Sequence, residues 1–184
     1  MMFPPDTCKL YQIFAQTLEY PSVSTPGVTT ECVKLLGACG LRTPMPEFAD
    51  FIKGQKLAAL EELYSSTFDM TPAATLYMGY HLFGETPKRS VFLIKLQEAY
   101  QSHNFDNGRE LADYLPSTLR FISIAKDKDF VLPLLQDCLL PNLNVIGTTL
   151  EKTKNPYRLL TNSLHTFIER QAHKLLKTGD IQHV

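Results

Sequence analysis

The 184-residue chain has no tryptophan, few glycines and cysteines, and no excess of charge of either sign. Its 18 basic and 19 acidic residues give a formal net charge of -1. The large basic field that attracts nucleic-acid phosphates is therefore missing, and we expect no nucleic-acid partner. With 44% hydrophobic residues, the chain is expected to bury a sizeable core as one domain over residues 1–184.

The four cysteines contain no C-x-x-C pair and are too sparse for a disulfide scaffold, so we expect reduced thiols in a cytoplasmic protein. Cys32 and Cys39 are a heptad apart and are expected to be small hydrophobic residues on one helix face. The N-terminus resembles no secretory signal, and from the sequence we expect no run that approaches the roughly 20 apolar residues of a membrane span. We expect neither export nor a membrane-spanning segment.

The motifs of several catalytic classes are also missing. The nine glycines form neither G-x-G-x-x-G nor G-x-x-x-x-G-K, and no G-x-S-x-G nucleophile elbow is present. The histidines show no H-x-x-x-H or H-E-x-x-H spacing, so no metal site is expected. Paired carboxylates such as Glu110 and Asp113 are more often helix-start residues than an acid and base pair. We therefore expect a protein that is not an enzyme and has no catalytic residues and no cofactor.

Apolar residues recur every three or four positions almost throughout, which predicts an all-α fold, a bundle of about eight to ten helices. Prolines and glycines set most of the expected boundaries. Gly40 is expected to end the second helix as a C-cap, after a break at Pro26 and Gly27. The expected helices are 7–20, one around 33–39, 47–53, 57–68, 71–82, 87–102, 113–126, a stretch from 129 that Pro133 and Pro141 kink or divide, and 156–177.

Four residues are predicted to cap helices. Thr71-Pro72 and Thr86-Pro87 each combine a threonine N-cap with proline in the first turn, and are expected to open the helices 71–82 and 87–102. Asp113 and Asp129 are the expected N-caps of the next two. In the last helix, an apolar stripe is predicted from Leu160, Leu164, Phe167, Gln171 and Leu175, widened by Ile168 and Leu176.

Aromatic residues are dense in the middle of the chain. Tyr77, Tyr80, His81 and Gly84 fall on one face of the predicted helix 71–82, and Arg89 lies in the first turn of the next. Such a face is either ordinary core or the lining of a groove for an amphipathic peptide.

Three segments carry a resemblance to a known family. They are Tyr64-x-x-x-Phe68-Asp69, then Thr75-Leu76-Tyr77-x-x-Tyr80-His81-x-x-Gly84-Glu85-x-x-x-Arg89, and Glu110-Leu111-x-Asp113-x-Leu115-Pro116. In order and spacing they resemble the NarJ-type nitrate reductase assembly chaperones, which are similar to the wider TorD/DmsD group of redox-enzyme maturation proteins. The specific match covers roughly residues 57–125.

The resemblance implies an all-helical chaperone that binds the N-terminal segment of the apo catalytic subunit of a molybdoenzyme. It would assist molybdenum cofactor insertion before membrane attachment or export, in contact with cofactor-delivery proteins, as a monomer or homodimer. We expect the peptide site to include Tyr64, Phe68, Tyr77, Tyr80, His81, Arg89, Glu110, Asp113 and Tyr114, beside a hinge at Leu115 and Pro116.

Two positions depart from the family pattern. Ala112 stands where proline is usual, and Tyr114 stands where histidine is usual. Because a tyrosine hydroxyl does not titrate near neutral pH, any role of that histidine is not carried over. The client is therefore open among related molybdoenzymes. A permanent helical scaffold subunit and a weak nucleotide hydrolase are the alternatives, the latter disfavoured by the missing phosphate loop.

Overall fold

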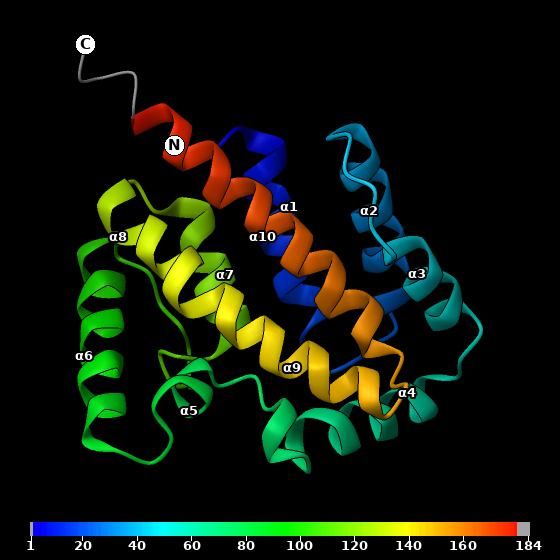
Figure 1. Cartoon of the computed structure of the whole chain (residues 1–184). Helices are drawn as coiled ribbons and strands as arrows, with labels where there is room; N and C mark the ends of the chain where they lie inside the picture. Colours follow the sequence, from blue (N-terminus) through cyan, green and yellow to red (C-terminus); the bar gives the residue numbers. More distant parts are fainter. Residues whose placement is uncertain (1, 180–184) are drawn as a thin grey trace.

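The computed structural model describes residues 2–179, and that part of the chain is all-α, as predicted. Most of its helices pack side by side around one buried hydrophobic cluster (Figure 1). The α-helices are α1 (Pro5–Thr17), α2 (Thr25–Ala38), α3 (Met45–Lys53), α4 (Leu57–Tyr64), α5 (Met78–Phe83), α6 (Pro87–Ser102), α7 (Leu115–Ile124), α8 (Lys128–Pro133), α9 (Leu140–Lys152) and α10 (Tyr157–Gly179). Two π-helical segments, η1 (Ser65–Asp69) and η3 (Leu134–Leu139), and a 3-10 segment, η2 (Pro72–Ala74), complete the order.

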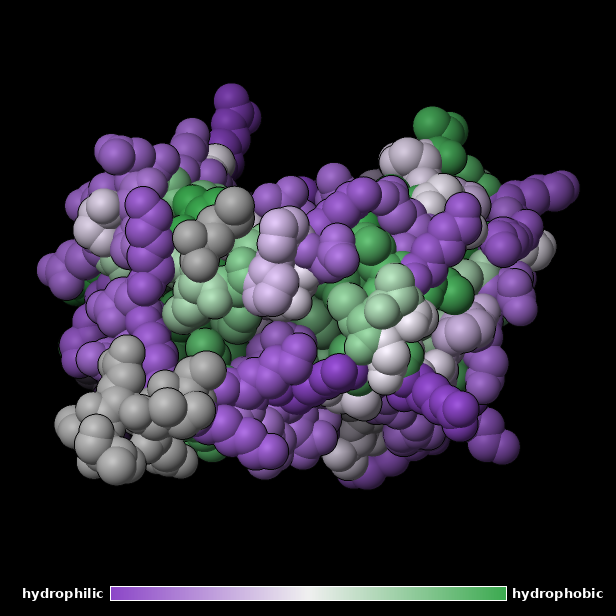
Figure 2. Space-filling view, turned by 90° about the horizontal axis from the view of Figure 1, so that it is seen from above, coloured by the Kyte–Doolittle hydropathy of each residue, from purple (hydrophilic) through white to green (hydrophobic). Residues whose placement is uncertain are grey.

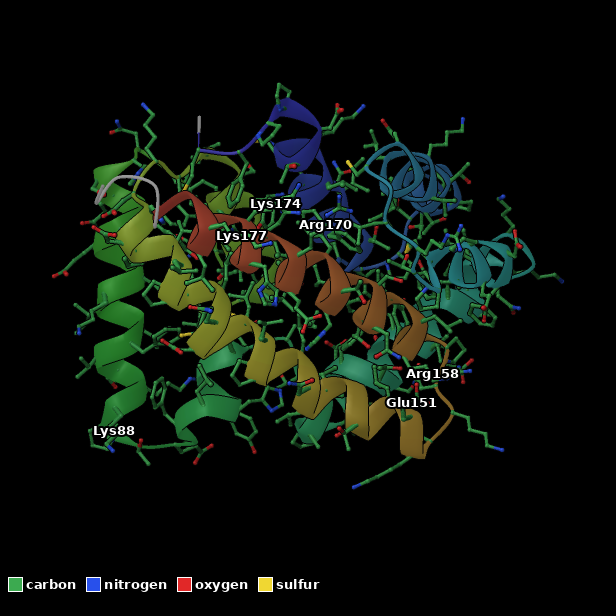
Figure 3. The ribbon with its side chains drawn as sticks, turned by 45° about the horizontal axis from the view of Figure 1, so that its top comes forward. Lys88, Glu151, Arg158, Arg170, Lys174 and Lys177 are labelled. Atoms are coloured by element: carbon green, nitrogen blue, oxygen red, sulfur yellow. The ribbon has the colours of Figure 1, made fainter. Side chains whose placement is uncertain are left out.

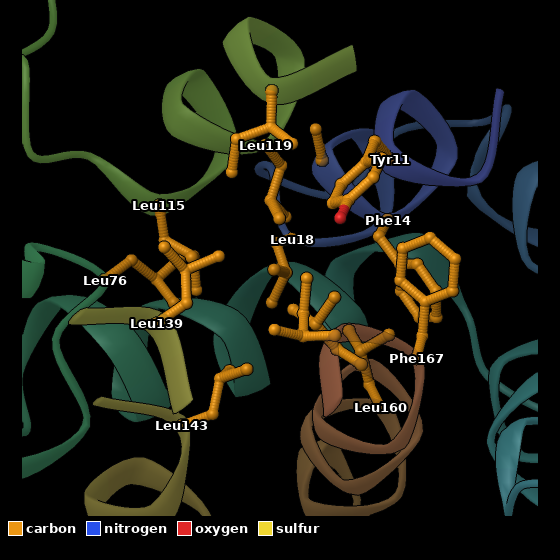
Figure 4. Close-up of a cluster of buried hydrophobic side chains, with 14 of the residues drawn as sticks. Tyr11, Phe14, Leu18, Leu76, Leu115, Leu119, Leu139, Leu143, Leu160 and Phe167 are labelled. Atoms are coloured by element: carbon orange, nitrogen blue, oxygen red, sulfur yellow. The ribbon is translucent and has the colours of Figure 1, made fainter. Parts of the chain in front are cut away.

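The centre of the molecule lies between α1, α7 and α10 (Figure 4). The Tyr11 and Phe14 rings of α1 lie 4.9 Å and 5.4 Å from the Phe167 ring of α10, measured between ring centroids. Leu119 of α7 is fully buried in the same cluster. Burying aromatic side chains of this size is among the largest apolar contributions to folding, so these three helices form the stable part of the molecule.

The last helix follows its predicted stripe closely. Residues 160, 164, 167, 168, 171 and 175 are all buried, whereas Leu176 is 41% exposed and does not widen the stripe as expected. Cys32 is fully buried in α2, and Cys39, half-buried, is the C-cap of that helix. Gly40 ends α2 as predicted, with a φ of 65° and a Leu41 N–H to Leu36 carbonyl bond of 2.9 Å.

Several predicted helix starts are wrong. Pro26 and Gly27 lie in the first turn of α2 and do not precede it. The N-cap carboxylate of α8 is Asp127, which accepts from the Asp129 and Phe130 N–H groups, so Asp129 lies in the first turn. The predicted start of α6 is confirmed, with Thr86 as its N-cap residue, but the Thr86 hydroxyl donates to the Phe83 carbonyl and makes no capping bond.

The predicted helix 71–82 is broken. Thr71 donates its hydroxyl to the Ser66 carbonyl and caps nothing, and only Pro72–Ala74 forms one 3-10 turn after it. Residues 75–77 are extended, and α5 begins at Met78. Tyr77 therefore lies before the helix, and the predicted helical face shared by Tyr77, Tyr80 and His81 does not form.

The stretch Lys128–Lys152 is one continuous helical run (Figure 1). Pro133 directly precedes its π-helical segment η3, and Pro141 is the second residue after that segment. The prolines thus alter the hydrogen-bonding pattern without separating the helices. By length and composition alone this run is apolar enough to cross a membrane, contrary to our expectation. A core helix passes the same test, and this one packs against α10 and α5.

One face of the molecule carries both polar and apolar surface. Seen from above, the molecule is hydrophilic around its edges, with apolar surface between them (Figure 2). Among the described residues, large exposed hydrophobic side chains include Tyr20, Met70, Val91, Ile94 and Leu111. Val91 and Ile94 lie on α6. Tyr20, Met70 and Leu111 lie in loops that belong to the candidate site or adjoin it.

Candidate functional site

Two of the family-like segments meet at a short antiparallel bridge between Tyr77 and Tyr114. The Met78 N–H donates to the Asp113 carbonyl at 3.0 Å, and the Leu115 N–H donates to the Leu76 carbonyl at 2.8 Å. Leu76 and Leu115 point into the core near Leu139 (Figure 4). The extended residues before α5 are thus fixed to the start of α7 by backbone bonds and by shared burial.

Asp113 caps the N-terminus of α5 and not that of α7, whose N-cap is Tyr114. Its side chain is fully buried, and its Oδ2 accepts from the Gly79 N–H and from Arg89 Nε, each at 3.1 Å. Arg89 Nη2 lies at the same distance from Oδ2. One carboxylate oxygen therefore ties together α5, α6 and the start of α7.

Gly79 is required by this arrangement. A Cβ atom at that position would lie 2.6 Å from Asp113 Oδ2 and 3.1 Å from Arg89 Cγ. The first contact is too short for van der Waals packing and the second is tight, so a side chain at residue 79 would displace the ion pair.

Burial raises the pKa of Asp113, and the positive charge and hydrogen bonds of Arg89, together with the Gly79 N–H, oppose that rise. The other carboxylate oxygen, Oδ1, is buried without a hydrogen-bond partner among the described residues. Since the Asp113 carboxylate is buried and paired with Arg89, it stabilises the fold of the site and is not exposed on its surface.

Tyr100 of α6 also joins that helix to the start of α7. Its hydroxyl donates to the Ala112 carbonyl at 2.8 Å and lies 3.1 Å from Thr118 Oγ1. Ala112, where the family usually has proline, is buried.

Beside the bridge lies a pocket of about 220 Å³ with mainly aromatic and acidic walls. Its nine lining residues come from the α1–α2 loop, the end of α4 with η1, the extended segment before α5 and the start of α7. They are Tyr20, Tyr64, Phe68, Asp69, Thr75, Leu76, Tyr77, Glu110 and Tyr114.

The tyrosine hydroxyls of the pocket are held by a fixed set of bonds. Tyr64 donates to the Leu18 carbonyl at 3.0 Å, so the 3.4 Å contact between the Tyr64 and Tyr114 hydroxyls is donated by Tyr114. Tyr77 donates to Glu110 Oε2 at 2.7 Å. Three hydroxyl protons are therefore used within the protein.

The same environment keeps these hydroxyls neutral. Burial is the largest cause that raises the pKa of Tyr64, Tyr77 and Tyr114, and nearby carboxylates raise it further. Asp69 acts on Tyr64 and Tyr114, and Glu110 acts on Tyr77 and Tyr114. The pocket thus combines neutral aromatic rings with a negative electrostatic field.

The structure brings together five of the predicted peptide-site residues, namely Tyr64, Phe68, Tyr77, Glu110 and Tyr114. Tyr80 and His81 lie on α5 outside the pocket, and His81 Nε2 is 2.8 Å from the Thr75 carbonyl. Arg89 and Asp113 form the ion pair behind the bridge.

Four lining residues were not among the predicted site residues, namely Tyr20, Asp69, Thr75 and Leu76, and of these Tyr20 alone lies outside the family-like segments. Tyr20 follows the first helix and is 54% exposed, and its ring centroid lies 5.4 Å from that of Tyr64. No local pattern marks it, because the contact joins segments far apart in the chain. The predicted hinge residues Leu115 and Pro116 are buried at the start of α7, and their role as a hinge stays a prediction.

Other hollows have a different character. A larger one, of about 480 Å³, lies between α9 and α10 and is lined mainly by polar residues such as Asn144, Thr148 and Asn162. Another, of about 320 Å³, lies between α6 and the α8–η3 segment, around Phe92 and Phe130. Neither contains residues of the bridge.

Several basic side chains lie on other parts of the molecule. Figure 3 shows Arg170, Lys174 and Lys177 along α10 and Lys88 at the start of α6. No lysine, arginine or histidine lines the aromatic pocket within residues 2–179. Its negative field is therefore not balanced by a positive wall residue.

Comparison with known proteins gives a consistent result, although no family model matches the chain. It is 27% identical over 151 residues to the probable nitrate reductase molybdenum cofactor assembly chaperone NarJ of Bacillus subtilis, a match that covers 82% of this chain and 81% of that protein. It is 28% identical over 102 residues to the nitrate reductase molybdenum cofactor assembly chaperone NarJ of Escherichia coli K12, covering 55% of this chain and 42% of that protein. The chain is thus a relative of the NarJ-type molybdenum cofactor assembly chaperones, and the resemblance in its sequence is confirmed.

Proposed function

We propose that this chain is a cytoplasmic chaperone that assists molybdenum cofactor insertion into the catalytic subunit of a molybdoenzyme. Its relatives are named as nitrate reductase assembly chaperones, which supports this class of function. We further propose that it acts as a single domain, before the client is attached to a membrane or exported.

In this proposal the chaperone binds the N-terminal segment of the apo catalytic subunit at the aromatic pocket. The single observation that carries it is the convergence of three family-like segments on one pocket, where Phe68, Tyr77 and Tyr114 lie together. Aromatic side chains supply large contact areas at low conformational cost, which suits peptide recognition.

The experiment is complementation of a Bacillus subtilis strain that lacks its own NarJ relative. We expect the chain to restore the molybdenum content of the purified nitrate reductase, measured by mass spectrometry, and to be absent from the mature enzyme. Wild-type chain at equal stoichiometry in the finished enzyme would favour the permanent scaffold subunit. No restoration, with the chain folded and present, counts against the proposal for that client.

Peptide binding is measured separately by calorimetry with the N-terminal segment of that nitrate reductase catalytic subunit. Tyr77→Ala and Tyr114→Ala are expected to weaken binding at least about tenfold, as anchor residues do. Tyr80→Ala is the matched control, because Tyr80 lies outside the pocket. Equal loss in all three variants would extend the site onto α5, and no loss in any would remove the pocket from the proposal.

A further inference from the structure

The wall formed by Tyr64, Tyr77, Tyr114 and the two carboxylates offers acceptors and no free donor, and the side-chain donors of the pocket are the hydroxyls of Tyr20 and Thr75. The hydroxyl protons of Tyr64, Tyr77 and Tyr114 are directed to Leu18, Glu110 and Tyr64 respectively, so only their oxygen lone pairs remain. The two carboxylates, Asp69 and Glu110, are acceptors only when ionised. A ligand that satisfies this wall must therefore bring its own donors.

The charge of the pocket is negative without compensation. Asp69 and Glu110 are both exposed, and neither forms an ion pair with a basic side chain within the described residues. By contrast Glu19, Glu151 and Asp113 each have an arginine partner. The pocket is thus a place where a positive group would gain electrostatic energy.

The aromatic rings add a second attraction for the same kind of group. Four tyrosines and one phenylalanine line a volume of about 220 Å³. A lysine or arginine side chain above an aromatic ring is attracted by the negative face of the ring, and Arg also stacks on it. Rings, acceptors and carboxylates together select a cationic donor over a neutral or anionic group.

The surroundings of the pocket indicate that the cation belongs to a polypeptide. Tyr20 of the wall is half exposed, and Met70 and Leu111, which directly follow Asp69 and Glu110 in the chain, are 77% and 50% exposed. Exposed apolar side chains next to a polar pocket suit a ligand that carries apolar residues on both sides of its charge.

We propose that this pocket binds a lysine or arginine side chain of the client segment, held by the rings of Tyr64, Tyr77 and Tyr114 and by the carboxylates of Asp69 and Glu110. The inference rests on the proposed function for its occupant, since it names the residue type of the client that the site reads. The chemistry of the pocket itself is tested without any client.

The first test uses a small probe. N-acetyl-arginine amide is titrated into the full chain while ring signals of Tyr64, Tyr77 and Tyr114 are followed by NMR, and N-acetyl-citrulline amide is the neutral control. We expect saturable shifts with the arginine compound and at least about fivefold weaker binding of citrulline. Asp69→Asn and Glu110→Gln should each weaken arginine binding about threefold.

Glu62→Gln provides a matched loss of charge on the exposed part of α4, outside the pocket, and should change nothing. Equal binding of the arginine and citrulline compounds would overturn the inference. So would the absence of ring shifts, or an equal loss of affinity in Glu62→Gln and Glu110→Gln.

The second test identifies the occupant. Each lysine and arginine of the client peptide is replaced by glutamine, and affinities are measured with the wild-type chain and with the Asp69→Asn, Glu110→Gln double variant. One replacement should weaken wild-type binding about tenfold and have a much smaller effect on the double variant. A peptide that binds but tolerates every replacement overturns this inference and leaves the proposed function standing. A peptide that does not bind, while arginine amide does, contradicts the proposed function and assigns the pocket to a free cation.

Discussion

The region around α10 and the region around α5 and α6 are held together in different ways. In α10, Leu160 and Leu164 are fully buried and the helix packs along α9. In α6, Val91 and Ile94 are 54% and 58% exposed, and the helix makes its main packing contact with α5. The α5–α6 region buries fewer large side chains, Met78, Leu96 and Tyr100 among them, and is also held by the polar bonds of Asp113.

This difference predicts that the two regions contribute unequally to the stability of the fold. Around α10 the helices are joined by extensive apolar burial, whereas α5 and α6 depend more on individual hydrogen bonds and one ion pair. The pocket lies against the core, to which its residues Tyr64, Phe68 and Leu76 belong. Regions with few apolar contacts open at lower free energy than the core, and binding sites are often drawn from them. The following substitutions test the comparison.

The largest effect is expected in the core. Phe167→Ala removes a fully buried ring that contacts Tyr11 and Phe14, and should lower the free energy of unfolding by about 3–5 kcal/mol. Urea denaturation measures it. Val91→Ala on exposed α6 is the control and should change stability by about 0.5 kcal/mol or less. Similar values for the two variants would abolish the distinction between the regions.

The ion pair comes next. Asp113→Asn keeps the volume of the side chain but removes the charge that faces Arg89, and should lower the free energy of unfolding by about 2–3 kcal/mol. This is less than for a fully buried pair, because the Arg89 side chain is 21% exposed. Asp50→Asn, whose contact with Lys53 is largely solvated, should cost about 0.5 kcal/mol or less. If Asp113→Asn is as mild as the control, Asp113 does not hold the junction.

Glycine substitutions test the close packing behind the bridge. Gly79→Ala places a methyl group against Asp113 and Arg89 and should destabilise the fold by about 1–3 kcal/mol. Gly37→Ala, in the last turn of α2, where the added Cβ meets no atom within 4 Å beyond the adjacent backbone of its own helix, should instead stabilise it by about 0.5–1 kcal/mol. In thermal unfolding, the melting temperature should fall in Gly79→Ala and rise in Gly37→Ala. A fall or a rise in both variants would contradict the close packing at Gly79.

The smallest effect concerns pH. Burial lowers the pKa of His81 below its ordinary value of 6.5, and the bond to the Thr75 carbonyl opposes this only in part. The unfolded chain therefore binds the proton more readily, so the contribution of His81 is present above the ordinary pKa and is lost as pH falls through the lower folded value. In His81→Gln the free energy of unfolding should fall less steeply between about pH 7 and about pH 5. An unchanged slope would show that His81 is not the group that titrates.

The core and the site also differ in how much of each could be predicted from the sequence. The Thr86-Pro87 pattern placed the start of α6 where it is observed, and periodicity predicted the buried stripe of α10, because apolar burial repeats with the helical turn. Near the site, Asp113 was assigned to the helix that follows it. Its partners are Gly79, 34 residues earlier, and Arg89, 24 residues earlier, and no local pattern encodes such contacts.

The pocket itself was predicted in part. Its residues Tyr64, Phe68, Tyr77, Glu110 and Tyr114 came from the family-like segments, and the structure brings them together. The break at residues 75–77 was missed because Thr71-Pro72 is a strong local helix-start pattern. Backbone bonds to Asp113 and Leu115 compete with helix formation there, and they depend on a segment that is distant in the sequence.

The most direct test of the central claim is to map where a client segment binds. NMR of the full chain with the N-terminal peptide of a nitrate reductase catalytic subunit compares the Tyr77 and Tyr114 rings with the Phe92 and Phe130 rings of the α6–α8 hollow. We predict saturable perturbation of Tyr77 and Tyr114, with Phe92 and Phe130 unchanged. Perturbation of Phe92 and Phe130, with the tyrosines of the pocket silent, would contradict the account.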